Sequence, residues 1–123
     1  LRCHGPDAAE WSGWIDRPDS RPWSAFAIRE DEYVVAKTAQ DAFGSSSLGF
    51  VLVNLGVRNL IFTGGHTEAC LGKTAASAKR AGYQTLCVDD ATSNARESTR
   101  MQGIRDAGFD YVVATDALLD ALT

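Results

Sequence analysis

Short apolar runs alternate with longer stretches of helical spacing along most of this chain, from Tyr33 to the C terminus. The apolar runs predict four strands, at residues 33–36, 60–63, 85–88 and 111–114. The longer stretches predict four helices, at residues 47–55, 69–81, 97–107 and 116–122. Three of these helices are followed by a residue suited to a left-handed C-terminal cap, namely Gly56, Gly82 and Gly108.

The predicted strands are apolar throughout and are joined by helices, which is typical of strands buried on both faces. Connections of this kind build a parallel sheet. The fold class that we predict is therefore α/β. It is a doubly wound, mostly parallel sheet with helices on both faces, in three α/β/α layers.

All three tryptophans and all three prolines lie within the first 23 residues. Because prolines interrupt regular structure so often there, residues 1–32 are predicted to form a variable loop region with one short helix near residues 8–14. This region belongs to a single domain that spans residues 1–123. Trp11 and Trp14 share one face of that helix, which suits either a pocket wall or a subunit contact.

Composition and charge narrow the class of protein. The 123 residues are 45% hydrophobic and 23% charged, with a formal net charge of -4. These values describe one globular domain and argue against a surface for nucleic acid or anionic membranes. No apolar run approaches the roughly 20 residues that a membrane span needs. Three widely spaced cysteines suit a reducing compartment, so we expect a cytoplasmic location.

Candidate chemistry lies where predicted strands end, because ligands of parallel sheets bind outside the carboxyl ends of the strands. After the strand at residues 60–63 the chain turns on Gly64 and Gly65 and enters a helix, for which Thr67 is a suitable N-cap. Cys70 then falls in the first helical turn, where the helix dipole favours a thiolate over a thiol. Backbone N–H groups around His66 and Cys70 are candidates for an oxyanion hole.

Lys37 directly follows the strand at residues 33–36, and its ammonium beside Cys70 would stabilise a thiolate. The residues alone leave two ordinary interpretations open: Cys70 as a small buried side chain, and Lys37 as a solvated lysine at a strand end. Cys87 lies within an apolar strand and is assigned to the core. The two histidines lack metal-ligand spacing and no cofactor motif is present, so we expect neither a metal nor a cofactor.

Together these segments resemble the isochorismatase-like cysteine hydrolases. The first part of the match is the strand-lysine segment Tyr33-Val34-Val35-Ala36-Lys37 with the following Asp41-Ala42-Phe43. The second part is the strand, glycine turn and cysteine helix, Leu60-Ile61-Phe62-Thr63-Gly64-Gly65-His66-Thr67-Glu68-Ala69-Cys70. The strand that ends in Val88-Asp89-Asp90-Ala91 completes the pattern.

The resemblance implies an Asp, Lys and Cys triad in which Cys70 attacks an amide or ureido carbonyl and Lys37 helps to hold the thiolate. It also implies a cis peptide between Gly65 and His66, which aims backbone N–H groups of this turn and of Cys70 at the oxyanion. Isochorismatases proper lack this nucleophile, so the chain is more similar to the amidohydrolase members. A small-molecule substrate, no cofactor and a homo-oligomer, dimer or tetramer, are what the family implies.

One part of the family pattern is absent. The family's aspartate follows its first strand, and no segment before Lys37 resembles that strand, since Asp7, Asp16 and Asp19 lie among loop residues. We therefore expect that this sequence begins inside a longer polypeptide that supplies the first strand, with a second chain as the alternative source of that strand. Two alternatives remain: a catalytically silent relative or fragment that acts in subunit assembly, and a domain that binds a small anion at the turn of residues 64–67.

Overall fold

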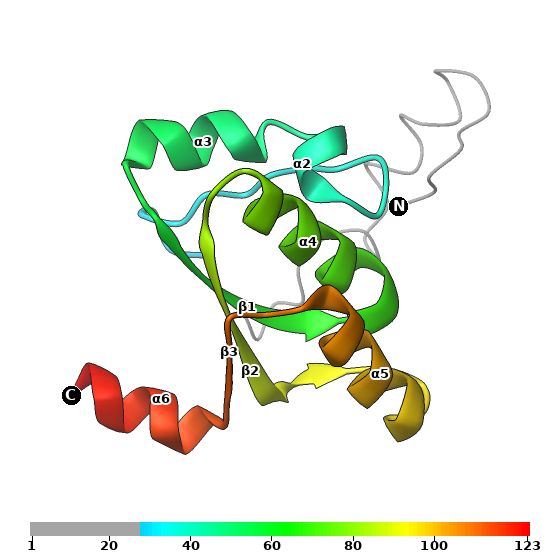
Figure 1. Cartoon of the computed structure of the whole chain (residues 1–123). Coiled ribbons are helices and arrows are strands. Elements are labelled where there is room, and N and C mark those ends of the chain that lie inside the picture. The colour runs from blue at the N-terminus through cyan, green and yellow to red at the C-terminus, as the bar shows by residue number, and fades with distance from the viewer. Residues whose placement is uncertain (1–27) are drawn as a thin grey trace.

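Three parallel strands form the sheet at the centre of the structure (Figure 1). The structure is a computed structural model, and it describes residues 28–123. Within them, β1 (Asn59–Gly65), β2 (Gln84–Ser93) and β3 (Tyr111–Val113) pair in the order β1-β2-β3. Each pair is joined by a helix that crosses from the end of one strand to the start of the next, which is why the strands run parallel.

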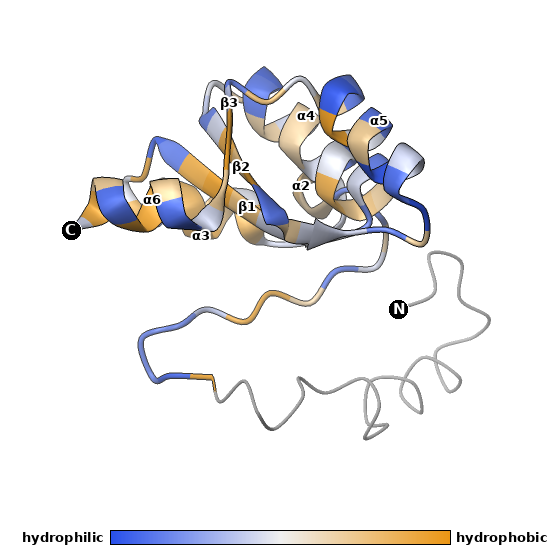
Figure 2. Ribbon diagram, turned by 90° about the horizontal axis from the view of Figure 1, so that it is seen from below, coloured by the Kyte–Doolittle hydropathy of each residue, from blue (hydrophilic) through white to orange (hydrophobic). Residues whose placement is uncertain are grey.

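Helices lie on both sides of this sheet (Figure 2). Helices α4 (Gly72–Arg80) and α5 (Glu97–Ala107) pack together over one face. Helix α6 (Thr115–Leu122) contacts β2 on the other side of the sheet. The predicted fold class, a parallel α/β sheet with helices, is confirmed.

The core lies between the sheet and helix α4. Ala75 and Ala78 of α4 and Cys87 of β2 are fully buried, and these small side chains let the helix approach the strands closely. Cys87 is therefore a core residue, as predicted. The remaining buried hydrophobic residues extend this core, and they are Leu52, Leu71, Val88, Ile104 and Ala107.

The predicted strand at residues 33–36 is wrong. This segment is not paired with any described strand, and Tyr33 and Val34 are 66% and 67% exposed. Figure 2 shows the described chain before α2 running apart from the sheet. The physical reason is that a strand needs a partner for its backbone N–H and C=O groups, and apolar side chains alone do not supply one.

The remaining elements agree with the predicted ones in type and differ at their ends. The predicted helix at residues 69–81 is two elements, the π-helix η2 (Thr67–Leu71) followed by α4, and the strand predicted at residues 85–88 extends over all of β2. A short helix, α2 (Ala42–Ser45), precedes α3 (Leu48–Leu55). Gly56 and Gly108 end α3 and α5 in the left-handed conformation, as predicted.

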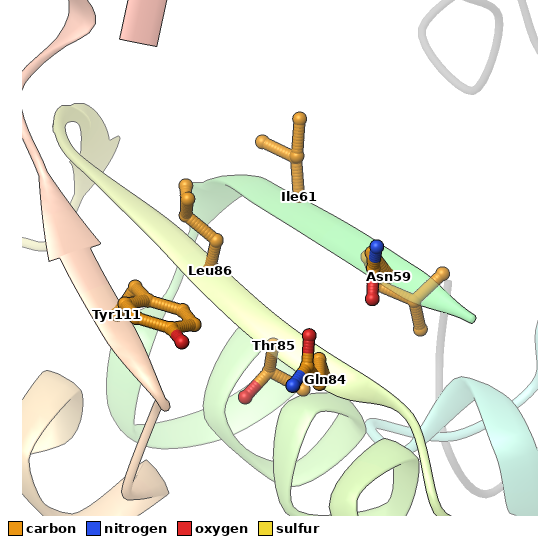
Figure 3. Close-up of a pocket in the computed structure, with 7 residues that line it drawn as sticks. Asn59, Ile61, Gln84, Thr85, Leu86 and Tyr111 are labelled. Atoms are coloured by element: carbon orange, nitrogen blue, oxygen red, sulfur yellow. The ribbon is translucent and has the colours of Figure 1, made fainter. Parts of the chain in front are cut away.

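The sheet face opposite α4 and α5 is partly open, so the strands are not buried on both faces within residues 28–123. Ile61, Leu86 and Tyr111 occupy matching register positions on the three strands, and Ile61 and Tyr111 are more than half exposed. They line a hollow of about 220 Å³ (Figure 3). The hollow begins at the first residues of the strands and is remote from the carboxyl end of β1, where the candidate chemistry lies.

Candidate active site

The turn from β1 into η2 needs both of its glycines, for different reasons. Gly64 has φ 105°, a backbone conformation that residues with a side chain rarely adopt. Gly65 pairs with Ser93 of β2, and a Cβ on Gly65 would lie 2.6 Å from Ser93 Oγ. The peptide bond between Gly65 and His66 is cis, as the family resemblance implies.

Helix η2 begins at Thr67, two residues before the helix predicted at residues 69–81, and His66 rather than Thr67 is its N-cap. His66 is the extended residue that precedes the first turn, and its carbonyl accepts from the N–H groups of Ala69 and Leu71 at 3.0 and 3.2 Å. The prediction of Thr67 as the N-cap is wrong. Its side chain is fully buried and donates to the carbonyl of Arg100 at 3.0 Å, which ties η2 to α5 instead.

Lys37 and Cys70, which are 33 residues apart in sequence, meet in the structure. Lys37 Nζ lies 3.5 Å from Cys70 Sγ and donates at 2.9 Å to the carbonyl of Ala39. Both side chains belong to residues of intermediate exposure. The sulfur is therefore neither sealed inside the core nor fully solvated, and the lysine ammonium lies beside it.

The other predicted site residues adjoin this pair in the chain. Gly65 and His66 form the turn that leads into η2, and the His66 side chain is 62% exposed with Nδ1 3.8 Å from a Glu68 oxygen. The imidazole therefore faces solvent, so that only the backbone of His66 is left as a candidate site element. Asp7, Asp16, Asp19, Cys3 and the three tryptophans lie outside the described residues.

An ion-pair cluster beside the turn was not predicted from the sequence. Arg100 of α5 reaches the end of β2 and donates to the Asp89 carboxylate at 2.5 Å, to the Asp89 carbonyl at 2.8 Å and to Thr92 Oγ1 at 3.0 Å. Arg100 also pairs with Glu97 one helical turn earlier. These bonds to Glu97 and Asp89 raise the pKa of Arg100, while the hydrogen bond from Arg100 lowers the pKa of Glu97.

The cluster fixes the segment of β2 that faces the glycine turn. The i, i+3 spacing of Glu97 and Arg100 and the aspartate directly after an apolar run were the sequence signals for it. Their meeting depends on α5 packing over the end of β2, which periodicity does not reveal. Among residues 28–123, no group of three or more His, Cys, Asp or Glu side chains is placed to hold a metal ion.

The second described thiol, Cys87, is buried, whereas Cys70 is partly exposed and lies beside an ammonium. Burial raises the pKa of Cys87 to about 11, and the nearby Asp89 carboxylate acts in the same direction. A thiol with this pKa stays protonated at neutral pH. Cys87 therefore has a packing role, and Cys70 is the thiol that the site presents.

The chain is similar in sequence to two named hydrolases. Maleamate amidohydrolase of Pseudomonas putida is 27% identical over 96% of this chain and 62% of its own length. Streptothricin hydrolase of Streptomyces noursei is 33% identical over 64% of this chain and 30% of its own length. This chain therefore spans less than two thirds of the length of both relatives.

Solved structures give the same result for the fold. An isochorismatase-like hydrolase from Alkaliphilus metalliredigens superposes with a TM-score of 0.79 at 27% identity, over 85% of this chain and 59% of that protein. N-carbamoylsarcosine amidase from Thermoplasma acidophilum has a TM-score of 0.74 at 24% identity, over 92% of this chain and 68% of the other. The Isochorismatase domain model matches residues 4–117, nearly the whole sequence, and the chain therefore belongs to the isochorismatase family of hydrolases.

Proposed function

We propose that this protein is a cysteine-dependent amidohydrolase that cleaves a small carboxamide or ureido compound through a thioester intermediate. The observation that carries the proposal is the 3.5 Å separation of Lys37 Nζ and Cys70 Sγ at the carboxyl end of a parallel strand. Ligands of such sheets bind at this end of the strands. The amidohydrolase names of relatives such as maleamate amidohydrolase support the substrate class.

In the proposed reaction the Cys70 thiolate attacks the carbonyl carbon and forms a carbon–sulfur bond. The carbon–nitrogen bond then breaks, and the amine leaves after it takes up a proton. Water attacks the resulting thioester, which releases the carboxylic or carbamic acid and returns the sulfur. In this proposal Lys37 helps to hold the thiolate through its ammonium, which lies 3.5 Å from the sulfur and is itself held by the carbonyl of Ala39.

The oxyanion that forms during each attack needs donors, and the backbone N–H groups of Gly65, His66 and Cys70 are the proposed ones. They belong to the glycine turn and to the beginning of η2, where a helix leaves N–H groups without intrahelical partners. Donors of this kind stabilise negative charge as it develops on a carbonyl oxygen. The family resemblance adds an aspartate that acts as the general base and follows the family's first strand, which no segment before Lys37 in this sequence resembles.

The test offers the protein a panel of small amides that includes maleamate and an N-carbamoyl amino acid. Release of the acid product measures hydrolysis. Cys70→Ala should abolish turnover, because no thioester can form without the sulfur. Mass spectrometry of the unmodified chain during turnover should show an acyl adduct on the peptide that contains Cys70. Cys87→Ala is the matched control, since it removes the other described thiol and should retain activity.

Turnover that survives in Cys70→Ala would rule out the thioester route. A cytoplasmic location and a homo-oligomeric state stay predictions from the sequence and the family resemblance. Sedimentation of the purified chain measures the oligomeric state directly.

A further inference from the structure

Lys37 reaches Cys70 from a part of the chain that has no regular structure. The segment before it is unpaired with any described strand, and the loop after it reaches α2 only at residue 42. A long lysine side chain on such a segment loses considerable rotamer freedom when its ammonium is held at one point. Some other contact must therefore fix this loop against the helix that carries Cys70.

Asp41 supplies that contact with both of its carboxylate oxygens. One oxygen accepts the N–H of Phe43 at 3.0 Å and caps α2. The other accepts the hydroxyl of Ser77 at 2.5 Å. Ser77 is buried on α4 and also accepts a hydrogen bond from Arg80 at 2.7 Å, so its own proton is directed toward Asp41. A carboxylate acceptor makes this a charge-assisted hydrogen bond, which is stronger than a neutral one.

Ser77, which makes this contact with Asp41, lies on the continuous helical segment η2–α4 that also carries Cys70. Cys70, Thr74 and Ser77 are spaced by four and three residues along η2 and α4, which brings them to one side of the helix. Thr74 is also buried, and its hydroxyl oxygen accepts the N–H of Ala42 at 3.1 Å. The loop is thus pinned at residues 41 and 42 to the same helical side on which Lys37 meets Cys70.

We propose that Asp41 is a positioning residue, which through its hydrogen bond to Ser77 holds the Lys37 loop where the ammonium meets Cys70 Sγ. This inference rests on the proposed function, because it assigns Lys37 the task of keeping the sulfur ionised. The three residues between Lys37 and Asp41 are few enough that a fixed Asp41 restricts where Lys37 can lie. Without it, the ammonium leaves the sulfur for solvent.

The test measures the rate at which iodoacetamide alkylates Cys70 across pH 5 to 10, in the full chain, with site assignment by mass spectrometry. Asp41→Ala should move the midpoint of the rate profile upward by about one pH unit, equivalent to a tenfold slower reaction at neutral pH. Ser77→Ala leaves the cap of α2 intact and should move the midpoint in the same direction by a smaller amount. Gln40→Ala is the matched control, because it removes only an exposed contact between the same loop and Lys73, and it should change nothing.

A second comparison separates positioning from general loss of structure. In a Lys37→Met background, Asp41→Ala should have no further effect on the profile, because the ammonium it positions is gone. An equal shift with and without Lys37, or no shift in folded Asp41→Ala and Ser77→Ala, would overturn the inference. The alkylation assay needs no substrate. A failure to find amide hydrolysis would therefore contradict the proposed function, while the alkylation rates would still test the positioning role of Asp41.

Discussion

At the scale of single residues, two thiols of this protein have opposite environments. Cys70 is of intermediate exposure and has an ammonium 3.5 Å away, whereas Cys87 is fully buried in β2. Desolvation penalises the charged form of a buried thiol, and the Asp89 carboxylate adds to that penalty. Cysteine therefore has two roles in this fold: Cys70 is the proposed nucleophile, and Cys87 is a core residue.

This contrast predicts selective alkylation in the folded protein. At pH 7, iodoacetamide should modify Cys70 and leave Cys87 unmodified, because a thiol with a pKa of about 11 is ionised only to about one part in ten thousand. Peptide mapping after a time course measures both rates. Addition of urea should make Cys87 reactive, and rapid modification of Cys87 without denaturant would contradict its place in the core.

At the scale of elements, the contact between η2 and α5 depends on the absence of side chains. A Cβ on Gly103 of α5 would lie 2.5 Å from the backbone nitrogen of Glu68 and 2.6 Å from Thr67 Oγ1. Gly72, where η2 gives way to α4, is equally crowded, because a Cβ there would collide with the carbonyl oxygen of Thr67 in η2 itself. Gly103 therefore lets α5 lie against the beginning of η2, the helix that carries Cys70, while Gly72 leaves room within that helical run.

Gly103→Ala should therefore lower the free energy of unfolding by about 1 to 3 kcal/mol, the usual effect of overpacking a close contact. It should also slow alkylation of Cys70, since Thr67 at the beginning of η2 must move. Urea denaturation measures the first effect and peptide mapping the second. Ser98→Ala, at an exposed position of the same helix, is the control. If Gly103→Ala were as stable as Ser98→Ala, the contact between α5 and η2 would not be tight enough to exclude a methyl group.

At the scale of the whole molecule, Asp110, in the connection just before β3, contacts the end of α4 and the beginning of β2 some 25 to 31 residues earlier in the chain. Its carboxylate accepts the N–H of Thr85 at 2.8 Å at the beginning of β2, and it pairs with Lys79 near the end of α4 at 3.0 Å. The hydrogen bond from Thr85 and then the one from Lys79 hold the pKa of Asp110 below its ordinary value of 3.8. Asp90 and Glu97 have lowered pKa values as well, through Thr115 and Arg100.

The lowered pKa of Asp110 predicts a pH dependence of stability. Because the folded protein binds this proton less tightly than the unfolded chain, the carboxylate stabilises the fold above pH 3.8 and the benefit is lost as pH falls through the lowered value. Asp110→Asn should therefore reduce stability most at pH 6, with a difference from the unmodified chain that shrinks toward pH 2. Urea denaturation from pH 6 to pH 2 measures it. Asp120→Asn is the exposed control, and a difference that is independent of pH would contradict the assignment.

Much of the fold followed from local pattern alone. The apolar runs at residues 60–63 and 85–88 lie within β1 and β2, and the run at residues 111–114 overlaps β3 except for its last residue. The glycines that end α3 and α5 are left-handed, as their positions predict. These features depend on side-chain spacing and on backbone conformations open to few residues, both of which are readable in order along the chain. The segment at residues 33–36 has the same apolar pattern and is no strand, because pairing requires a neighbour that no local pattern contains.

The sequence by itself determined the α/β class, the family resemblance, and the pairing of a lysine with a cysteine as the chemistry to look for. Only the tertiary structure decided that Lys37 Nζ lies 3.5 Å from Cys70 Sγ, that Thr67 is tied to α5, and that Asp41 meets Ser77 across 36 residues of chain. Periodicity records which side of a helix or strand is buried, whereas a hydrogen bond between distant segments depends on how whole elements pack. The geometry of the proposed site belongs to that second kind of information.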